Sequence, residues 1–249
     1  MRFGISALKY IVYLLMYAGF AVGAASVTVL CLALFWLPDN DRVRRWFRRV
    51  IHAHFRVWMA YLTGNRLFHV RFVGFEAFPR DTGLIVVSNH PGLMDITYLL
   101  AAIPDALCIF KPQIRRNPIL GATARRAGYL ASDGGIDLVR YAAEAAAAGH
   151  TLIIFPEGTR TRVGRRLNSV KPGFALIAQR AKVPVQLVSI ACDSALASKD
   201  HPWWILPKLP AHITVTLGPL LAPPPTPHIE PLVEEATAWL DSHALPVPA

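Results

Sequence analysis

The sequence predicts an α/β fold: a mostly parallel sheet flanked by helices, with an N-terminal hydrophobic membrane segment. Three observations predict it. Short apolar runs alternate with amphipathic helical runs along most of the chain. Two of the apolar runs end in polar junctions that contain glycine, where ligands gather in parallel sheets. A long uncharged stretch opens the chain, and the 249 residues suffice for one α/β domain and an appendage.

The uncharged stretch covers residues 10–37. A helix needs about 20 apolar residues to cross a bilayer, so we expect a single membrane span. A half-inserted helical hairpin, bent near Gly19 and Gly23, is the alternative. The small residues that follow Gly23 also suit a signal peptide, but the apolar run continues too far beyond them.

A basic segment with aromatic residues follows the apolar stretch. Its arginines surround Trp46 and Phe47 and are Arg42, Arg44, Arg45, Arg48 and Arg49. This pattern predicts an amphipathic helix at an anionic membrane surface, although an ordinary stop-transfer flank explains it equally well. We therefore expect residues 1–60 to form the membrane-anchoring part and residues 61–249 the α/β domain. The positive-inside rule places that domain in the cytoplasm.

The net charge of the chain limits the classes of partner that it is expected to bind. The net charge is +10, which suits nucleic acid, anionic lipid or a phosphorylated ligand. Because the basic segment directly follows a membrane segment, we expect membrane lipids and no nucleic acid. The three cysteines have no metal-site spacing, and the histidines lack a His-Glu-x-x-His pattern, so no metal is predicted.

Periodicity and turn residues place the remaining elements. Strands are expected at 68–73, 83–87, 106–110, 129–131, 151–155, 185–191 and 213–217. Helices are expected at 91–102, 118–127, 136–148, 172–181 and 228–243, and residues 219–227 are expected to be extended.

The first polar junction carries His90 and Asp95. His90 follows a buried strand, and Pro91 suits the first position of the next helix. The backbone at His90 can therefore turn back toward Asp95. A carboxylate beside an imidazole fixes its tautomer and leaves the other ring nitrogen as a base. Taken alone, the pair is better explained as a capped turn.

The second junction follows the strand at 151–155 and contains Glu157, Gly158, Thr159 and Arg160. Gly158 allows a close approach of the backbone to a ligand. A hydroxyl and a planar guanidinium suit phosphate, and Lys171 adds a further cation downstream. The alternative is a solvated basic loop in which Glu157 pairs with Arg160.

Together the two junctions resemble a known family. Residues 89–95 match the His-x4-Asp motif, and residues 155–160 match the second signature of the glycerolipid acyltransferases, the lysophosphatidic acid acyltransferase group. The resemblance covers about residues 84–190. It includes the Lys171-Pro172-Gly173 helix start and the proline-containing strand near Val183.

This resemblance implies a 1-acylglycerol-3-phosphate O-acyltransferase-like enzyme of phospholipid biosynthesis in the cell inner membrane. His90 would be the general base on a lipid hydroxyl, and Asp95 would orient it. The hydroxyl would attack an acyl thioester, acyl-CoA or acyl carrier protein, without an acyl-enzyme or a cofactor. Glu157, Gly158, Thr159, Arg160 and Lys171 would bind the acceptor head. Backbone N–H groups near Gly92 or Gly158 would hold the oxyanion.

One position departs from the family pattern. Gly134 stands where the family's middle motif has a phosphate-holding arginine. There are three alternatives: Arg125, Arg126 or Arg140 replaces it, Arg160 holds the phosphate alone, or the acceptor is a different lipid, such as an aminolipid or a specialised bacterial lipid. A non-catalytic lipid-binding protein and a thioester hydrolase are the remaining alternatives.

Overall fold

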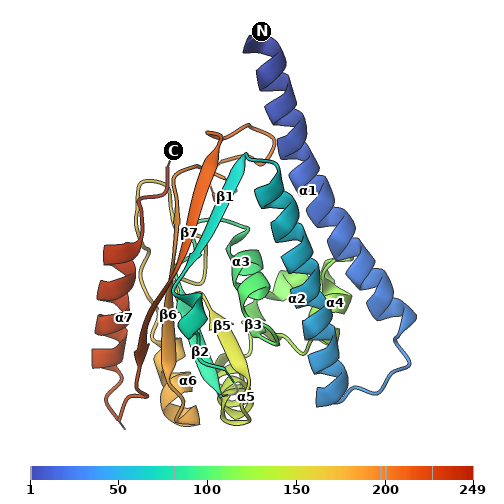
Figure 1. Ribbon diagram of the computed structural model, residues 1–249. Helices are drawn as coiled ribbons and strands as arrows, with labels where there is room; N and C mark the ends of the chain where they lie inside the picture. The colour runs from blue at the N-terminus through green and yellow to red at the C-terminus, as the bar shows by residue number, and fades with distance from the viewer. Residues whose placement is uncertain (1, 81, 197, 200, 226, 249) are drawn as a thin grey trace.

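A seven-stranded sheet forms the centre of the computed structural model, which describes residues 2–80, 82–196, 198–199, 201–225 and 227–248 (Figure 1). The strand order is β1-β7-β6-β2-β5-β3-β4. Within the described residues, β6 and β7 pair antiparallel and the other neighbouring strands pair parallel. The predicted α/β class with a mostly parallel sheet is confirmed.

The strands are β1 Phe68–Val73, β2 Leu84–Ser88, β3 Leu107–Phe110, β4 Leu130–Ala131, β5 Thr151–Ile154, β6 Val185–Cys192 and β7 Ala211–Leu221. The α-helices are α1 Arg2–Ala33, α2 Asp41–Gly64, α3 Asp95–Ala102, α4 Gly121–Arg126, α5 Gly135–Ala147, α6 Gly173–Ala181 and α7 Glu230–His243. Two 3-10 turns, η1 Phe75–Ala77 and η2 Pro112–Arg116, complete the described elements.

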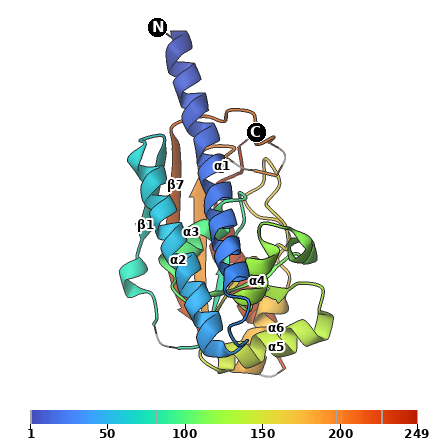
Figure 2. The same cartoon turned by 90° about the vertical axis from the view of Figure 1, so that its right-hand side faces the viewer.

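Two apolar cores sandwich the sheet. Successive side chains of a strand point to opposite faces, so Leu84 and Val86 of β2 enter one core, and Ile85 and Val87 enter the other. The first core is covered by α1 to α4, and the second by α5, α6 and α7, as the two views show (Figures 1 and 2). Both faces of β2 are buried, which explains its continuous apolar sequence.

The N-terminal helix α1 is continuous, so the alternative of a hairpin bent near Gly19 and Gly23 is wrong. Gly23 instead allows close packing, because a β-carbon there would collide with the His54 ring of α2. The chain reverses between α1 and α2, and the two helices lie against each other (Figure 2). The hairpin therefore consists of two complete helices.

Helix α1 has two apolar faces. Tyr13, Met16 and Cys31 are buried against the domain. Residues at seven-residue intervals on another face are more than half exposed: Leu8, Leu15, Val22, Val29 and Trp36, the last just beyond the helix. Among the described residues, α1 is the one helix long and apolar enough to cross a membrane, from Ala7 to Ala33.

Helix α2 is bound to the domain more firmly than its basic sequence suggests. Arg48 is buried, and its side chain donates to Asp105 at 2.5 Å and to the Ala127 carbonyl at 3.0 Å. Arg44 and Arg45 pair with Asp39 and Asp41 at the helix start. The predicted surface-lying basic face is therefore wrong for the buried Arg48, whereas Arg44 and Arg45 stay at the surface in their ion pairs. Helix α2 continues past residue 60.

Several element boundaries differ from the predictions. Helix α3 begins at Asp95 and not at Pro91, because Gly92 donates its N–H to the Asp95 carboxylate and residues 91–94 form a turn. Strand β7 extends through Leu221, into the segment predicted as merely extended. Helix α4 is short because Asn117 accepts from the N–H groups of Ile119 and Leu120 just before it.

Candidate active site

The site lies where β2, β5 and β6 end, because parallel strands bring their carboxyl ends to one edge of the sheet. His90 follows β2, and Asp95 is the first residue of α3. The His90 Nδ1 and Asp95 Oδ2 atoms lie 2.8 Å apart, as predicted from their spacing. The His90 side chain keeps 19% of its surface exposed, so the ring can be reached from outside.

Asp95 is held in one orientation inside the protein. Its Oδ2 atom also accepts the Gly92 N–H at 2.7 Å. Burial raises the pKa of the Asp95 carboxyl above its ordinary value, while hydrogen bonds from His90 and Gly92 and the charge of Arg160 act in the opposite direction. Because His90 Nδ1 faces this carboxylate, His90 Nε2 is the ring nitrogen left to act as a base.

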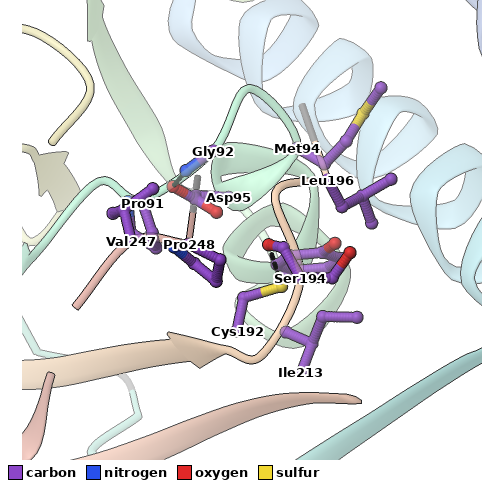
Figure 3. A pocket seen from close by; sticks show the side chains of 11 residues that line it. Pro91, Gly92, Met94, Asp95, Cys192, Ser194, Leu196, Ile213, Val247 and Pro248 are labelled. Carbon is purple, nitrogen blue, oxygen red and sulfur yellow. Dashed lines mark hydrogen bonds between the residues drawn. The ribbon is translucent and has the colours of Figure 1, made fainter. Parts of the chain in front are cut away.

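Apolar and uncharged side chains line a small cavity beside Asp95. Figure 3 shows Met94, Leu196 and Ile213 around this cavity, with Cys192 and Ser194. The C-terminal segment closes the cavity: Val247 is buried there and exchanges backbone hydrogen bonds with residues 164 and 165. This enclosure is the source of the desolvation at Asp95, and it also raises the pKa of the Cys192 thiol to about 12.

The second junction holds the His90 backbone. Glu157 Oε1 accepts the His90 N–H at 2.9 Å, and the His90 carbonyl accepts the Thr161 N–H at 2.7 Å. The His90 ring stacks on Phe155, with centroids 4.2 Å apart and planes at 16°. The loop after β5 therefore fixes both the peptide and the ring of His90.

The Glu157 carboxylate is engaged entirely by neighbouring groups of the chain. Besides the His90 N–H, it accepts the Thr161 hydroxyl at 2.9 Å on each oxygen and the Asn168 N–H at 2.8 Å. Burial raises its pKa, and these hydrogen bonds oppose the rise. With these partners, the buried Glu157 carboxylate is placed to position the His90 backbone. This role differs from the predicted contact with the acceptor head group.

The other predicted binding residues gather at the same loop. Gly158 has φ +68°, the left-handed region, and a β-carbon there would lie 3.0 Å from Lys171 Nζ. Gly158 and Lys171 are exposed, and Thr159 and Arg160 are partly exposed. The Arg160 guanidinium also donates to the Ser198 carbonyl at 3.0 Å. The loop thus places Lys171 Nζ beside Gly158 and carries a second cation, Arg160, two residues further along the chain, and this charge pattern suits a phosphate.

Both glycine N–H groups that the sequence suggested for an oxyanion already have acceptors. The Gly92 N–H donates to Asp95, and the Gly158 N–H donates to the Phe155 carbonyl at 3.0 Å. Each bond closes a tight turn, which the spacing of residues does not reveal. These two N–H groups are therefore engaged within the chain, and the expectation stays a prediction for other backbone N–H groups near Gly92 or Gly158.

Three arginines were candidates to replace the arginine that is missing at Gly134. Their described contacts lie away from the candidate active site. Arg126 caps the end of α1 by donating to the Leu34 and Leu37 carbonyls, and it lies over the Phe47 ring. Arg125 donates to the Arg115 carbonyl, and Arg140 pairs with Asp137 at the surface of α5. Gly134 itself precedes α5.

Sequence reasoning missed several residues that build the site. Asn89 makes two hydrogen bonds with Ile190 of β6, each 2.8 Å long, which tie the end of β2 to its neighbour. Asn89 lies inside the first motif, so its position was a usable signal. Thr161 and Asn168 carry no such signal, because their importance comes from Glu157. Within the described residues, no cluster of three His, Cys, Asp or Glu side chains could hold a metal ion.

The comparisons with known proteins all point to acyltransferases. A family model described as acyltransferase matches residues 69–191. A 1-acyl-sn-glycerol-3-phosphate acyltransferase of Helicobacter pylori is 33% identical over 113 residues, which are 43% of this chain and 48% of that protein. A lyso-ornithine lipid O-acyltransferase of Pseudomonas aeruginosa is 34% identical over 158 residues, 62% of this chain and 55% of that protein.

The matched part thus spans about half the length of these curated relatives. The fold is similar to the crystal structure of the 1-acyl-sn-glycerophosphate acyltransferase PlsC from Thermotoga maritima. The TM-score is 0.72 at 22% identity, over 98% of this chain and 97% of that one.

Proposed function

Because the chain belongs to the glycerolipid acyltransferase family, we propose that it is an O-acyltransferase. It moves an acyl chain from an acyl thioester to the hydroxyl of a lysophospholipid-like acceptor. The observation that carries this proposal is the 2.8 Å contact between His90 Nδ1 and the buried Asp95 carboxylate. That contact leaves His90 Nε2, at a partly open surface, as a base for a hydroxyl.

The proposed reaction is direct. The acceptor oxygen attacks the thioester carbonyl as His90 Nε2 takes the hydroxyl proton. The tetrahedral intermediate then collapses: the carbon–sulfur bond breaks, and the departing thiolate takes the proton from the imidazolium. Asp95 holds the ring and stabilises its charged form between the two steps. The products are the ester and the free thiol, so no acyl-enzyme and no cofactor enters the scheme.

The favoured acceptor is 1-acylglycerol-3-phosphate. Its phosphate carries two negative charges that suit Lys171, beside Gly158, and Arg160 of the same loop. The donor is acyl-CoA or acyl carrier protein, both of which present an acyl thioester. Glu157 acts in this scheme as a positioning residue for His90, and Thr159 adds a hydroxyl near the head group.

A lyso-aminolipid is the second candidate acceptor, and two observations favour it. Gly134 replaces the arginine expected in the middle motif, and Arg125, Arg126 and Arg140 make their described contacts elsewhere. A relative from Pseudomonas aeruginosa is named for a lyso-ornithine lipid. A site with fewer cations suits a head group that lacks a phosphate.

We further propose attachment to the cell inner membrane with the catalytic domain on the cytoplasmic side. One face of α1 packs on the domain while an opposite apolar stripe stays exposed along its length. This arrangement supports a helix lying within one leaflet, since a span would carry the packed domain into the bilayer. Residues 1–60 serve as this anchor, and residues 61–249 form the catalytic domain.

The test is an acceptor panel with the full chain in lipid vesicles. Radiolabelled acyl-CoA and acyl carrier protein are offered with 1-acylglycerol-3-phosphate, other lysophospholipids and a lyso-aminolipid, and the acylated lipid is counted. We expect the highest kcat/KM with 1-acylglycerol-3-phosphate. A preference for the lyso-aminolipid would favour the second candidate, free fatty acid alone would indicate a hydrolase, and no turnover would indicate a non-catalytic lipid-binding protein.

A further inference from the structure

Three large apolar residues are exposed in the loop between β6 and β7. Trp203, Trp204 and Ile205 are 52%, 57% and 48% exposed, and they follow one another in the chain. We call them the Trp203–Ile205 patch. A contiguous exposed patch of aromatic and aliphatic side chains marks an interaction surface more often than chance placement.

The patch is attached to the N-terminal half of α1. The Tyr10 hydroxyl donates to the Trp204 carbonyl at 2.9 Å, and the Trp203 and Tyr17 rings lie 5.7 Å apart. Figure 1 shows the loop running beside this half of the helix. The patch therefore lies against the side of α1 that carries Tyr10 and Tyr17, and these two contacts hold the loop beside the helix.

The chemistry of the patch suits a lipid interface better than a soluble protein. Indole rings combine an apolar body with an N–H donor and concentrate at the head-group level of membranes. Exposed lysines flank the patch at Lys199 and Lys208, where they can meet anionic head groups, although Lys208 also pairs with Asp193 at 3.5 Å. The same loop carries Ser198, whose carbonyl accepts from Arg160, so the patch lies near the acceptor site.

We propose that the Trp203–Ile205 patch is a second membrane-contact surface, which inserts at the head-group level next to α1. This inference rests on the proposed membrane attachment of α1. It gives the catalytic domain its own contact with the bilayer, beside the loop that holds Arg160. A lipid acceptor thereby enters the site from the membrane surface to which the patch is bound.

The first test uses quenching of tryptophan fluorescence by brominated phospholipids in vesicles. Trp204→Phe removes an emitter that the lipid quenches, so the quenched fraction falls relative to wild type. Trp239→Phe, on α7 at the other side of the sheet, removes an unquenched emitter, so the fraction rises. A higher quenched fraction in Trp204→Phe than in the wild type, or no quenching of the wild type, overturns the proposal. Either result would indicate that the patch binds a soluble partner.

The second test measures partitioning into vesicles that contain anionic lipid. Trp204→Ser/Ile205→Ser leaves Trp203 on Tyr17 and preserves the backbone bond from Tyr10, so the loop keeps its attachment to α1. We expect about tenfold weaker partitioning, the effect of removing two large apolar side chains from a lipid interface.

The matched control for partitioning is Ile136→Ser/Tyr141→Ser, which removes two exposed apolar side chains from α5. The control variant should partition like the wild type. If Trp204→Ser/Ile205→Ser and the control partition equally, the proposal is contradicted. Neither test requires turnover. A quenched Trp204 in a protein that acylates nothing would sustain the patch while refuting the proposed enzyme.

Discussion

The loops that follow β2 and β5 each place a buried carboxylate beside His90, yet the two acids do different work. Asp95 reaches the ring through Nδ1 at 2.8 Å, and Glu157 reaches the peptide N–H at 2.9 Å. Burial raises the pKa of both carboxyls. Asp95 thus faces a group that can gain a proton, while Glu157 faces backbone and hydroxyl donors whose protons are fixed.

The difference teaches that burial and a raised pKa do not by themselves identify a catalytic acid or base. The group that the carboxylate contacts decides which role it has. A carboxylate that contacts a titratable ring can stabilise the charge formed during a proton transfer. A carboxylate that accepts only N–H and O–H groups of its own chain fixes geometry. Substitution of each acid separates the two roles by the size and kind of its effect, and substitutions of Lys171 and His90 test the groups around them.

The largest of these effects is expected from Asp95→Asn. An amide can donate to Nδ1 and thereby favour the wrong tautomer of His90, so Nε2 no longer accepts a proton. We expect kcat to fall by about 10³-fold, measured as initial rates of acyl transfer in vesicles. Asp137→Asn, at an exposed ion pair on α5, is the matched control. A fall of less than threefold would remove Asp95 from the mechanism.

Glu157→Gln is expected to have a smaller and mixed effect. The amide nitrogen cannot accept, so one of the N–H groups of His90 or Asn168 loses its partner. We expect kcat to fall by about 10-fold through misplacement of His90, together with a loss of about 1–3 kcal/mol in the free energy of unfolding. Urea unfolding and rate measurements on one preparation check both. Glu144→Gln, exposed on α5, should change neither.

A loss of activity as large as that of Asp95→Asn, without a loss of stability, would contradict the positioning role of Glu157. It would mean that this carboxylate takes part in the reaction itself. The comparison between the two acids would then fail.

Lys171→Ala is expected to change binding more than turnover. Its Nζ lies near Gly158, where the phosphate of the acceptor would sit. We expect KM for 1-acylglycerol-3-phosphate to rise by about tenfold with kcat nearly unchanged, since uniform binding is lost. KM for a lyso-aminolipid should stay the same. Arg180→Ala, on the exposed end of α6, is the control, and an equal rise for both acceptors would speak against a phosphate contact.

The smallest expected effect is a pair of opposite pH dependences. Because burial raises the pKa of Asp95, the folded protein holds this proton to higher pH than the unfolded chain, so stability falls as pH rises through the raised pKa. Activity changes in the other direction, since only the ionised carboxylate supports His90. Unfolding by urea across the acidic range should therefore show a shallower pH slope in Asp95→Asn, and an unchanged slope contradicts the assignment.

The sequence predicted what depends on local pattern. Continuous apolar runs placed β2 and β5, and the spacing of His90 and Asp95 predicted their pairing. The role of Glu157 was not predictable, because its contact with the His90 N–H joins residues 67 positions apart and depends on a turn. The alternative of a bend near Gly19 and Gly23 was open for a similar reason: the packing of His54 on Gly23 is a contact between helices.

The central claim, that His90 is the base for a lipid hydroxyl, is tested most directly by the transfer rate of His90→Ala. Loss of a positioned base predicts a fall in kcat of about 10²–10⁴-fold with the preferred acceptor. His69 is exposed on the edge strand β1, so His69→Ala should retain the wild-type rate. A His90→Ala variant that transfers acyl groups at the wild-type rate would contradict the account.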